Sequence, residues 1–313
     1  MLTHHVGETG ELQPVRDVGE AMRSPWVDVT DPSAEEVQQL NQKLGIPMDY
    51  LAHALDPDEL ARAEHGEGHS LVVMRIPVQR EGHPDQPFTT VPLGVVISGG
   101  RLVTVCGVRQ ELTPALASAP NDAIHPHRPH RFVLRLLLMS AHRFLEHLKS
   151  INHQVDALED RLQASLENDS LMGLLKYQKA LVFFTTALRS NELLLERLRH
   201  DPHFPIPRAE EDLLEDVLIE LRQAMEVTRI ATEILSQMMD AFASIISNNL
   251  NVVMKFLASC TILLTIPTMI ASFYGMNVPL PGSAHALALG VVVAVSTAVT
   301  LVVAVVLRRR KWL

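Results

Sequence analysis

The sequence predicts an α+β membrane protein: an N-terminal cytosolic α/β domain, a long helical coiled-coil stalk and two C-terminal transmembrane helices. Residues 24–106 alternate short β-type runs with turns, and the residues that follow have long helical periodicities. The third observation is that no Asp, Glu, Lys or Arg occurs between Phe256 and Leu307. With 313 residues, the chain is long enough for one to three domains.

Residues 1–130 are predicted to form the α/β domain. The turn between the last two of its predicted strands is Ser98-Gly99-Gly100, which is typical of a hairpin. Asp31 or Ser33 is placed to cap a helix that has acidic residues in its first turn. The predicted strands are residues 26–29, 71–76, 93–97 and 101–105.

Residues 131–208 are predicted to form a helical hairpin, because apolar residues recur there at three-four spacing. Its second helix covers roughly 171–200 and ends where three prolines force a turn. A third helix starts near Glu210 and meets no proline or glycine until Pro267. Residues 209–275 are therefore expected to form a stalk helix that continues into the first membrane span.

The uncharged part of the chain predicts a membrane hairpin. Residues 256–275 and the apolar part of residues 286–313 are each long enough to cross a bilayer core of about 30 Å. Residues 276–285, with two prolines and a glycine, form the predicted external loop. Cations flank the hairpin at Lys255 and at residues 308–311, and the loop has none. The positive-inside rule then places both termini in the cytoplasm of a multi-pass inner (plasma) membrane protein.

Charge and motifs exclude several classes of function. The net charge of −9 argues against a nucleic-acid-binding protein, which needs a basic face. The sequence contains no glycine-rich phosphate loop, nucleophile elbow or HExxH motif, so neither an enzyme nor a cofactor is expected. Residues 201–240 hold ten acids against three arginines. Most of these acids are expected to lie on a solvated face, but in a symmetric bundle they also form rings that attract divalent cations.

Small and polar residues recur along one strip of the stalk and first span, and this strip indicates a pore. Two membrane helices cannot enclose a pore unless several chains assemble. Hydroxyl and amide groups that face the axis of such an assembly can hold the water around an ion. The alternative is that the hydroxyls bond to their own helix or join helices together. The residues of this strip are Asn251, Ala258, Thr261, Thr265, Thr268 and Ser272.

The first span is followed directly by Tyr274-Gly275-Met276-Asn277, and the chain closes with Lys311-Trp312-Leu313. In this position, with this topology, the sequence resembles the CorA family of magnesium/cobalt transport proteins, which belongs to the 2-TM-GxN superfamily. The resemblance covers most of the chain. Further segments that carry it are Trp26–Val29, Ala54–Glu59, Met239-Asp240 and Asn251–Leu257.

The resemblance implies a homopentameric channel for magnesium, and also for cobalt or nickel, with no cofactor besides the ion itself. The membrane potential would drive the ions, and cytosolic magnesium would gate the channel. The selectivity mouth would be formed by Tyr274, Gly275, Met276 and Asn277. The pore would be lined by Asn251 at its inner end, by the hydrophobic constriction Leu257, and by Thr265, Thr268 and Ser272.

The resemblance also implies regulatory metal binding in the stalk, where Asp216 and Asp240 match acids of the family. Asp216 falls where the family places one carboxylate of an inter-subunit metal site. Loss of the metal would let the stalks move apart and open the pore. The second ligand would come from the α/β domain, and four acids remain open for this role: Asp56, Asp58, Glu59 and Asp85.

Two other functions remain open. A zinc transporter of the ZntB type, in the same superfamily, shares the topology and the mouth, and the 15 histidines of the chain favour it. The Tyr-Gly-Met-Asn motif and the terminal Lys-Trp-Leu favour the magnesium branch. The other alternative is a membrane-anchored coiled-coil sensor that transports nothing, which leaves the polar strip of the first span unexplained.

Overall fold

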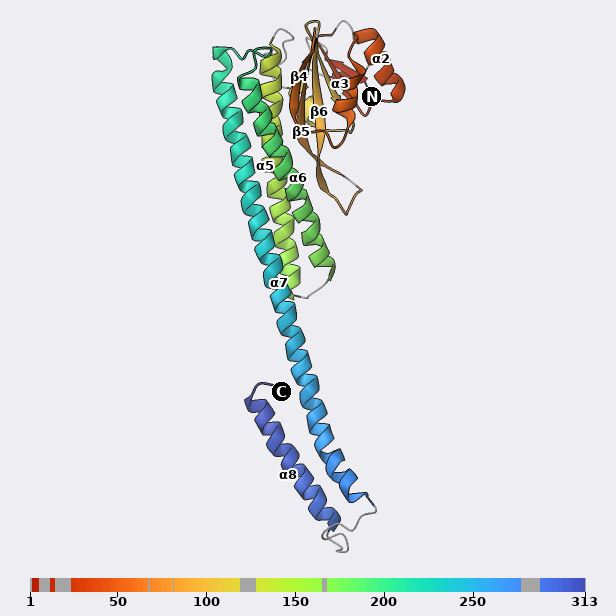
Figure 1. Cartoon of the computed structure of the whole chain (residues 1–313), viewed down its shortest axis with the longest axis vertical. Helices are drawn as coiled ribbons and strands as arrows, with labels where there is room; N and C mark the ends of the chain where they lie inside the picture. Colours follow the sequence, from red (N-terminus) through yellow and green to blue (C-terminus); the bar gives the residue numbers. More distant parts are fainter. Residues whose placement is uncertain are drawn as a thin grey trace. The chain divides into compact units, whose positions relative to one another are not determined.

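The computed structural model describes residues 2–5, 12–14, 24–66, 68–80, 82–118, 128–164, 168–276 and 288–312. The chain divides into two compact units, residues 1–237 and residues 238–313, and each unit is described by itself. The first unit contains a sheet with helices on both faces, and the second contains two helices long and apolar enough to cross a membrane (Figure 1). The predicted fold class is confirmed.

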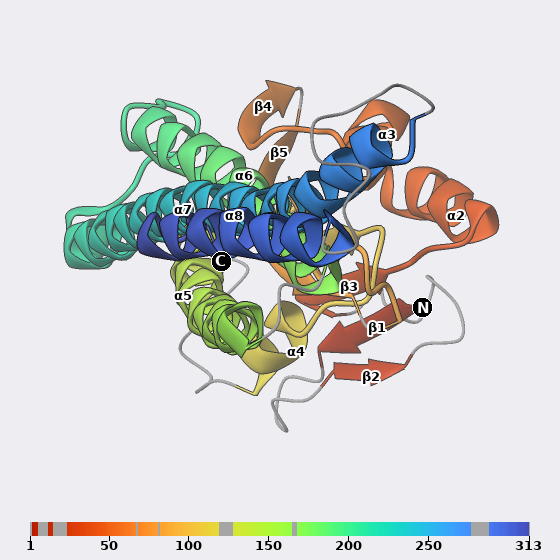
Figure 2. The same cartoon turned by 90° about the horizontal axis from the view of Figure 1, so that it is seen from below.

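The described residues of the first unit form a seven-stranded sheet in the order β2-β1-β3-β7-β6-β5-β4. The neighbours β3 and β7 run parallel, and every other pair of neighbouring strands is antiparallel. Figure 2 shows β2, β1 and β3 in this order at one side of the sheet. The strands are β1 (Leu2–His5), β2 (Leu12–Pro14), β3 (Trp26–Thr30), β4 (Arg62–Gly66), β5 (His69–Gln79), β6 (Phe88–Ser98) and β7 (Arg101–Cys106).

All four predicted strands are present; β3 and β7 are one residue longer than predicted, and β5 and β6 are longer by five and six residues. The prediction for β5 stopped at residue 76, before Pro77. Pro77 is in register with Thr90, and two residues earlier the N–H of Arg75 donates to Asn191 instead of to β6. The nitrogens of residues 75 and 77 therefore point to the same outer edge, so Pro77 costs the β5–β6 ladder no hydrogen bond.

The edge strand β4 was not predicted, because Arg-Ala-Glu-His-Gly has no apolar alternation. It pairs with the first residues of β5, from Arg62 opposite Val73 to Gly66 opposite His69. The side chains of β4 are half-buried or exposed, whereas most of β5 is buried. Pairing with an apolar neighbour, rather than the propensity of its own residues, determines this strand.

The predicted helices are present, and Ser33 rather than Asp31 caps the first of them. The Oγ of Ser33 accepts from the N–H of Glu36 at 3.2 Å, and the Glu36 carboxylate accepts from the N–H of Ser33 at 2.8 Å. The helices are α2 (Ala34–Leu44), α3 (Met48–Leu55), α4 (Leu112–Ala117), α5 (Pro129–Ala164), α6 (Asn168–Arg199), the short 3₁₀ helix η2 (Arg208–Glu210), α7 (Glu211–Tyr274) and α8 (Ala288–Arg309).

Helices cover both faces of the sheet (Figure 1). On one face, α2 and α3 pack through Leu40 and Leu51 against alternate residues of the strands, such as Val27 and Val103. On the other face, Trp26 packs edge-on against Phe132 of α5, with 5.1 Å between ring centroids. The side chains of neighbouring residues in β3 therefore enter opposite cores, as the pleat requires.

A buried polar network holds β3 in place. Asp28 accepts hydrogen bonds from the hydroxyls of Thr104 at 2.5 Å and Thr113 at 3.0 Å, and Trp26 Nε1 donates to Thr104 Oγ1 at 3.0 Å. Burial raises the pKa of Asp28, although the hydroxyl groups that donate to it act in the opposite direction. These bonds join β3, β7 and α4 at positions that the periodicity of the sequence does not identify.

A second network joins the sheet to α6. The side chain of Asn191 is fully buried, and it accepts from the N–H of Arg75 at 2.8 Å and donates to the Arg75 carbonyl at 2.7 Å. The Arg75 guanidinium is also buried, and it donates to the carbonyls of Pro57 and Glu59 at 2.8 Å and of Thr90 at 2.7 Å. This one residue therefore links β5, α6 and the segment that follows α3.

Candidate functional site: a hydroxyl-lined face of the first membrane helix

The second unit contains residues 238–274 of α7 together with α8, and α8 covers only one face of α7. Pro267, Ile270 and Ala271 of α7 line a largely apolar groove together with residues of α8. The polar residues of α8 face this groove, namely Ser296, Thr297 and Thr300. The remaining surface of α8 is mainly exposed Val and Leu, as expected for a helix that meets lipid.

A different face of α7 is not covered by any described residue of the chain and carries the predicted polar strip. A groove of about 380 Å³ runs along this face. It is lined by Thr261, Leu264, Thr265, Thr268, Met269 and Ser272. The structure therefore brings the predicted pore residues Thr265, Thr268 and Ser272 onto one surface.

The threonine hydroxyls of this face donate to their own helix. Thr261, Thr265 and Thr268 bond to the carbonyls four residues earlier, at 2.9, 2.7 and 2.8 Å. This is the arrangement that the alternative interpretation of the strip expected. A hydroxyl has one proton and two acceptor lone pairs, so each oxygen still presents acceptor capacity to the groove. The face therefore offers oxygen acceptors without a formal charge, which suits the water shell of a cation.

The predicted inner pore residues lie on the same helix. The side chain of Leu257 is 59% exposed, and its carbonyl accepts the hydroxyl of Thr261 one turn further on. Asn251 is exposed as well. In a single chain, the side chains of Leu257 and Asn251 are therefore available for contact with other copies of the helix.

The predicted mouth follows the end of α7. Tyr274 is the last residue of the helix, and the N–H of Gly275 still donates to the carbonyl of Ala271 at 3.0 Å. The N–H of Met276 donates to the carbonyl of Phe273 at 3.4 Å, so the turn tightens there. Asn277 lies outside the described residues.

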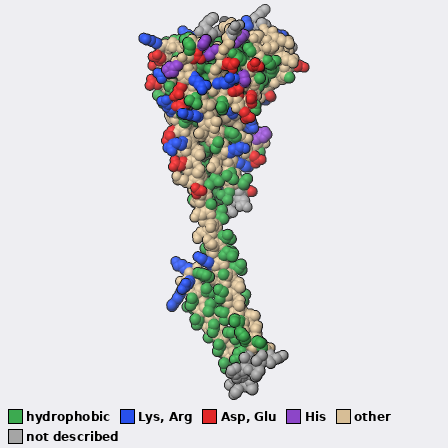
Figure 3. All heavy atoms as spheres, in the orientation of Figure 1, with side chains coloured by type: hydrophobic (Ala, Val, Ile, Leu, Met, Phe, Trp, Pro, Cys, Tyr) green, Lys and Arg blue, Asp and Glu red, His purple; other side chains and the backbone are tan. Residues whose placement is uncertain are grey.

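The opposite end of the second unit is cationic. Ser259 of α7 is buried, and its hydroxyl donates to the carbonyls of Lys255 at 2.8 Å and Trp312 at 3.4 Å. This contact brings the end of α8, with Arg308–Lys311, against the part of α7 that begins with Lys255. Figure 3 shows blue cationic side chains gathered where α8 ends, and many green hydrophobic side chains along the two helices from there. The sequence pattern did not identify Ser259 as the contact.

The predicted regulatory acids are exposed on α7. Neither Asp216, in the first unit, nor Asp240, in the second, forms an ion pair or a hydrogen bond with another described residue. Among the described residues no three His, Cys, Asp or Glu side chains are grouped so that they could hold a metal ion. The described residues of one chain therefore do not form a metal site of three such ligands at Asp216.

The four acids considered as its partner have different surroundings. Glu59 pairs with His53 at 2.9 Å and with Arg62 at 3.2 Å, and Asp85 pairs with Lys176 at 3.1 Å. An Asp56 carboxylate oxygen accepts from the N–H of Asp58 at 3.0 Å. Asp56 and Asp58 are exposed and carry no ion pair to a described residue. Of the four, these two are the carboxylates without an ion pair to a described residue, although both interact electrostatically with the nearby Arg75.

Together, these features define a membrane protein in which an α/β domain and a helical bundle precede two apolar helices, the first with an uncovered hydroxyl face. The chain belongs to the family described as CorA-like Mg²⁺ transporter protein, which matches residues 23–309. The resemblance noted from the sequence motifs is thereby confirmed.

Individual relatives agree with this assignment. The chain is 27% identical over 300 residues to the cobalt/magnesium transport protein CorA of Methanocaldococcus jannaschii, covering 94% of this chain and 93% of that protein. The complete structure of the CorA magnesium transporter from the same organism matches with a TM-score of 0.78 at 24% identity, over 92% and 91% of the two chains. The ZntB cytoplasmic domain from Vibrio parahaemolyticus shares the fold, with a TM-score of 0.58 at 9% identity, over 79% of this chain and 97% of that domain.

Proposed function

We propose that this protein is a channel for magnesium that also passes cobalt or nickel, and that it works as a homopentamer in the plasma membrane. The observation that carries the proposal is the uncovered, oxygen-lined face of α7 beside the side that α8 covers. In a ring of chains with α7 innermost, this face lines a pore and α8 meets lipid. Family membership and the similarity to a cobalt/magnesium transport protein support the same ion class.

The chemistry of magnesium fits such a face. Mg²⁺ releases its water ligands reluctantly and prefers oxygen ligands in octahedral geometry. Threonine oxygens and backbone carbonyls can accept hydrogen bonds from the water shell, so the ion keeps its waters while it crosses the bilayer. Asn277 amides at the outer end are proposed to select the hydrated ion, with Asn251 and Leu257 forming the inner end of the path.

The orientation proposed for the chain follows from its cationic end. Lys255 and Arg308–Lys311 gather at one end of the membrane unit, which the positive-inside rule assigns to the cytoplasm. Both termini are then cytoplasmic, and the segment after Tyr274 faces outward. The membrane potential contributes about 2.3 kcal/mol per charge per 100 mV, and twice that for a divalent ion. Uptake therefore needs no nucleotide.

Zinc transport of the ZntB type is the second candidate function. The observation in its favour is the shared fold of the cytoplasmic domain, together with the 15 histidines of the chain. A non-transporting coiled-coil sensor is the third candidate, and it gives the hydroxyl face of α7 no role.

We expect the purified protein to carry magnesium into liposomes when an inside-negative potential is imposed. Uptake of magnesium is measured with a trapped fluorescent indicator and compared with cobalt, nickel and zinc, each with and without a proton gradient. The channel predicts uptake that follows the potential, that cobalt and nickel compete for, and that a proton gradient does not change. Proton-dependent zinc uptake without magnesium uptake would identify the ZntB type instead, and no metal flux would favour the sensor.

We further propose that cytosolic magnesium closes the channel by bridging neighbouring subunits at Asp216. Its carboxylate is exposed and unpaired among the described residues, so one chain leaves it available as a ligand for a shared ion. Asp56 or Asp58 of the next subunit is the proposed partner. Asp240 is proposed to bind or concentrate the same ion closer to the membrane.

Replacing Asp216 with Asn is expected to weaken inhibition by magnesium on the cytosolic side. Removal of one carboxylate per subunit should raise the half-inhibitory magnesium concentration by about tenfold, the effect of about 1.4 kcal/mol per site. The measurement is liposome uptake at stepped internal magnesium. Glu215→Gln, which neutralises the exposed neighbouring acid, is the matched control and should leave the inhibition unchanged. An equal shift in both variants would indicate a general charge effect and not a site.

A further inference from the structure

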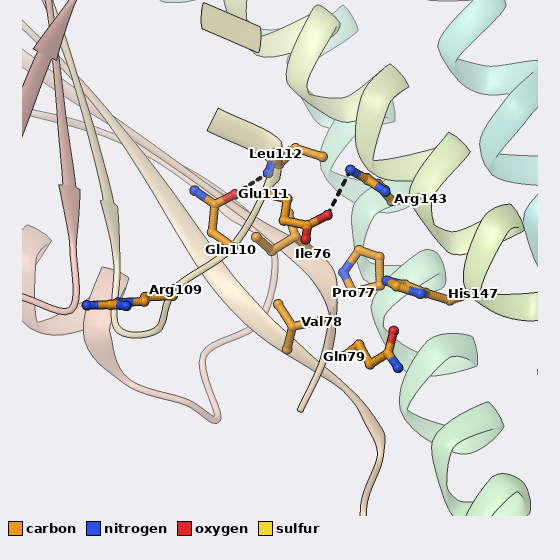
Figure 4. A pocket seen from close by; sticks show the side chains of 10 residues that line it. All are labelled: Ile76, Pro77, Val78, Gln79, Arg109, Gln110, Glu111, Leu112, Arg143 and His147. Atoms are coloured by element: carbon orange, nitrogen blue, oxygen red, sulfur yellow. Dashed lines mark hydrogen bonds and ion pairs between the residues drawn. The ribbon is translucent and has the colours of Figure 1, made fainter. Parts of the chain in front are cut away.

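A pocket in the first unit lies outside the proposed ion path. Its walls come from residues 76–79 at the end of β5, residues 109–112 between β7 and α4, and Arg143 and His147 of α5 (Figure 4). Its volume is about 550 Å³. Small-molecule sites range over about 300–1,000 Å³, so a ligand of nucleotide size fits this space.

The floor of the pocket is apolar, and backbone groups at its edge have no hydrogen-bond partner among the described residues. Ile76, Val78 and Leu112 are buried side chains of the lining. The N–H and the carbonyl of Arg75 point away from β6. Every second residue of a strand directs its backbone groups to the same side, so the carbonyl of Pro77 and the N–H and carbonyl of Gln79 also point away from β6. The pairing of β4 with β5 ends at Val73, so no strand in the described part of the chain pairs with this edge. A ligand could therefore rest on apolar surface and bond to the strand edge.

The charges of the lining leave one cation in excess. Arg143 is neutralised by Glu111 at 3.0 Å, the pair drawn in Figure 4, and by Glu146 at 2.9 Å. The side-chain oxygen of Gln110 already accepts hydrogen bonds from the N–H groups of Leu112 and Thr113 at the start of α4. Arg109 is exposed and has no ion-pair partner among the residues that the structure describes. Its guanidinium is a planar fork that fits a carboxylate or a phosphate.

His147 supplies a neutral polar group on the other side of the pocket. Figure 4 shows Arg109 on one side of Val78 and His147 on the other. Burial, with a further contribution from Arg143, lowers the pKa of His147, so its ring is neutral at pH 7 and offers one donor and one acceptor. The ring is positioned by Phe88, with 5.3 Å between centroids, and neither ring nitrogen bonds to another described residue.

We propose that this pocket binds a small organic anion: a planar or apolar body that carries one carboxylate or phosphate group. The Arg109 guanidinium, which points away from Val78 and His147 in Figure 4, turns inward to pair with the anionic group. The body lies on Val78 and Leu112, and a polar atom of the body meets His147. Neither the fold nor the ion path requires this ligand. The proposal is therefore independent of the transport function.

Binding is tested by isothermal titration calorimetry of the full-length protein in detergent, with AMP and phenylacetate as the phosphate and carboxylate probes. Adenosine and inorganic phosphate are the controls that lack the charge and the body, respectively. At least one of the two probes should bind, and both controls should bind at least tenfold more weakly. Arg109→Gln should weaken probe binding by about tenfold to a hundredfold, the effect of losing a charged hydrogen bond.

Arg161→Gln, which removes an exposed arginine elsewhere on α5, is the matched control and should bind the probes as the wild type does. The proposal is overturned if neither probe binds the wild type, or if Arg109→Gln binds as tightly as the wild type. Binding of inorganic phosphate as tight as that of AMP also overturns it, because the apolar floor would then contribute nothing.

Discussion

Replacing Asn277 with Ala is expected to reduce magnesium uptake into liposomes at least tenfold. In the proposed pentamer each subunit contributes one amide to the mouth, and each amide oxygen accepts a hydrogen bond from the water shell of the ion. A hydrogen bond to a charged group is worth about 1.5–3 kcal/mol, so the loss of even one such bond accounts for a tenfold change. The substitution removes all of these amides at once.

The measurement is the initial rate of potential-driven uptake at equal amounts of reconstituted protein. Asn249→Ala is the matched control, because Asn249 is exposed on α7 two residues from Asn251 and hence on the other side of the helix. This control should transport at the wild-type rate. If Asn277→Ala also transports at that rate, the mouth is not formed by the Gly-Met-Asn motif and the proposed path is wrong.

Much of the fold could be predicted from the sequence because its strongest signals are local. A stretch of about fifty residues without a formal charge has few places outside a bilayer, and three prolines after residue 200 end a helix whatever surrounds it. β4 and the full length of β5 could not be predicted. Their hydrogen bonds come from partners distant in sequence, as in the pair of Arg75 with Asn191, 116 residues away.

The residues of the candidate site could be predicted from the sequence, but the neighbours of each face of α7 could not. Asn251, Thr265 and Ser272 are separated by multiples of seven residues, and this spacing alone places them on one helix face. The face of α7 that turns toward α8 carries Pro267 and Ala271, which line a groove together with the hydroxyl residues of α8, and the sequence period does not identify this face. The structure adds that the covered face and the hydroxyl face are different. That separation is what the proposed arrangement of α7 and α8 in a ring requires.

Replacing Asn191 with Leu is expected to lower the melting temperature of the protein by roughly 5–15 °C. β4 no longer pairs with β5 at Arg75, and the Asn191 amide takes the place of a neighbouring strand by bonding both backbone groups of that residue. Leucine has a similar volume but neither donor nor acceptor. The Arg75 N–H would be left buried without a partner, and its carbonyl would keep only the Ser140 hydroxyl at 3.4 Å.

Each unsatisfied buried group costs about 1–3 kcal/mol, and in a unit of the size of residues 1–237 about 1 kcal/mol lowers the melting temperature by roughly 2–4 °C. Melting is followed for the full-length protein in detergent. Thr186→Leu is the control: Thr186 is an exposed residue of the same helix that bonds only to its own helix, and the change should shift melting by less than about 2 °C. A comparably small shift for Asn191→Leu would mean that water or a rearranged side chain satisfies Arg75. The seam between β5 and α6 would then depend on apolar packing and not on this amide.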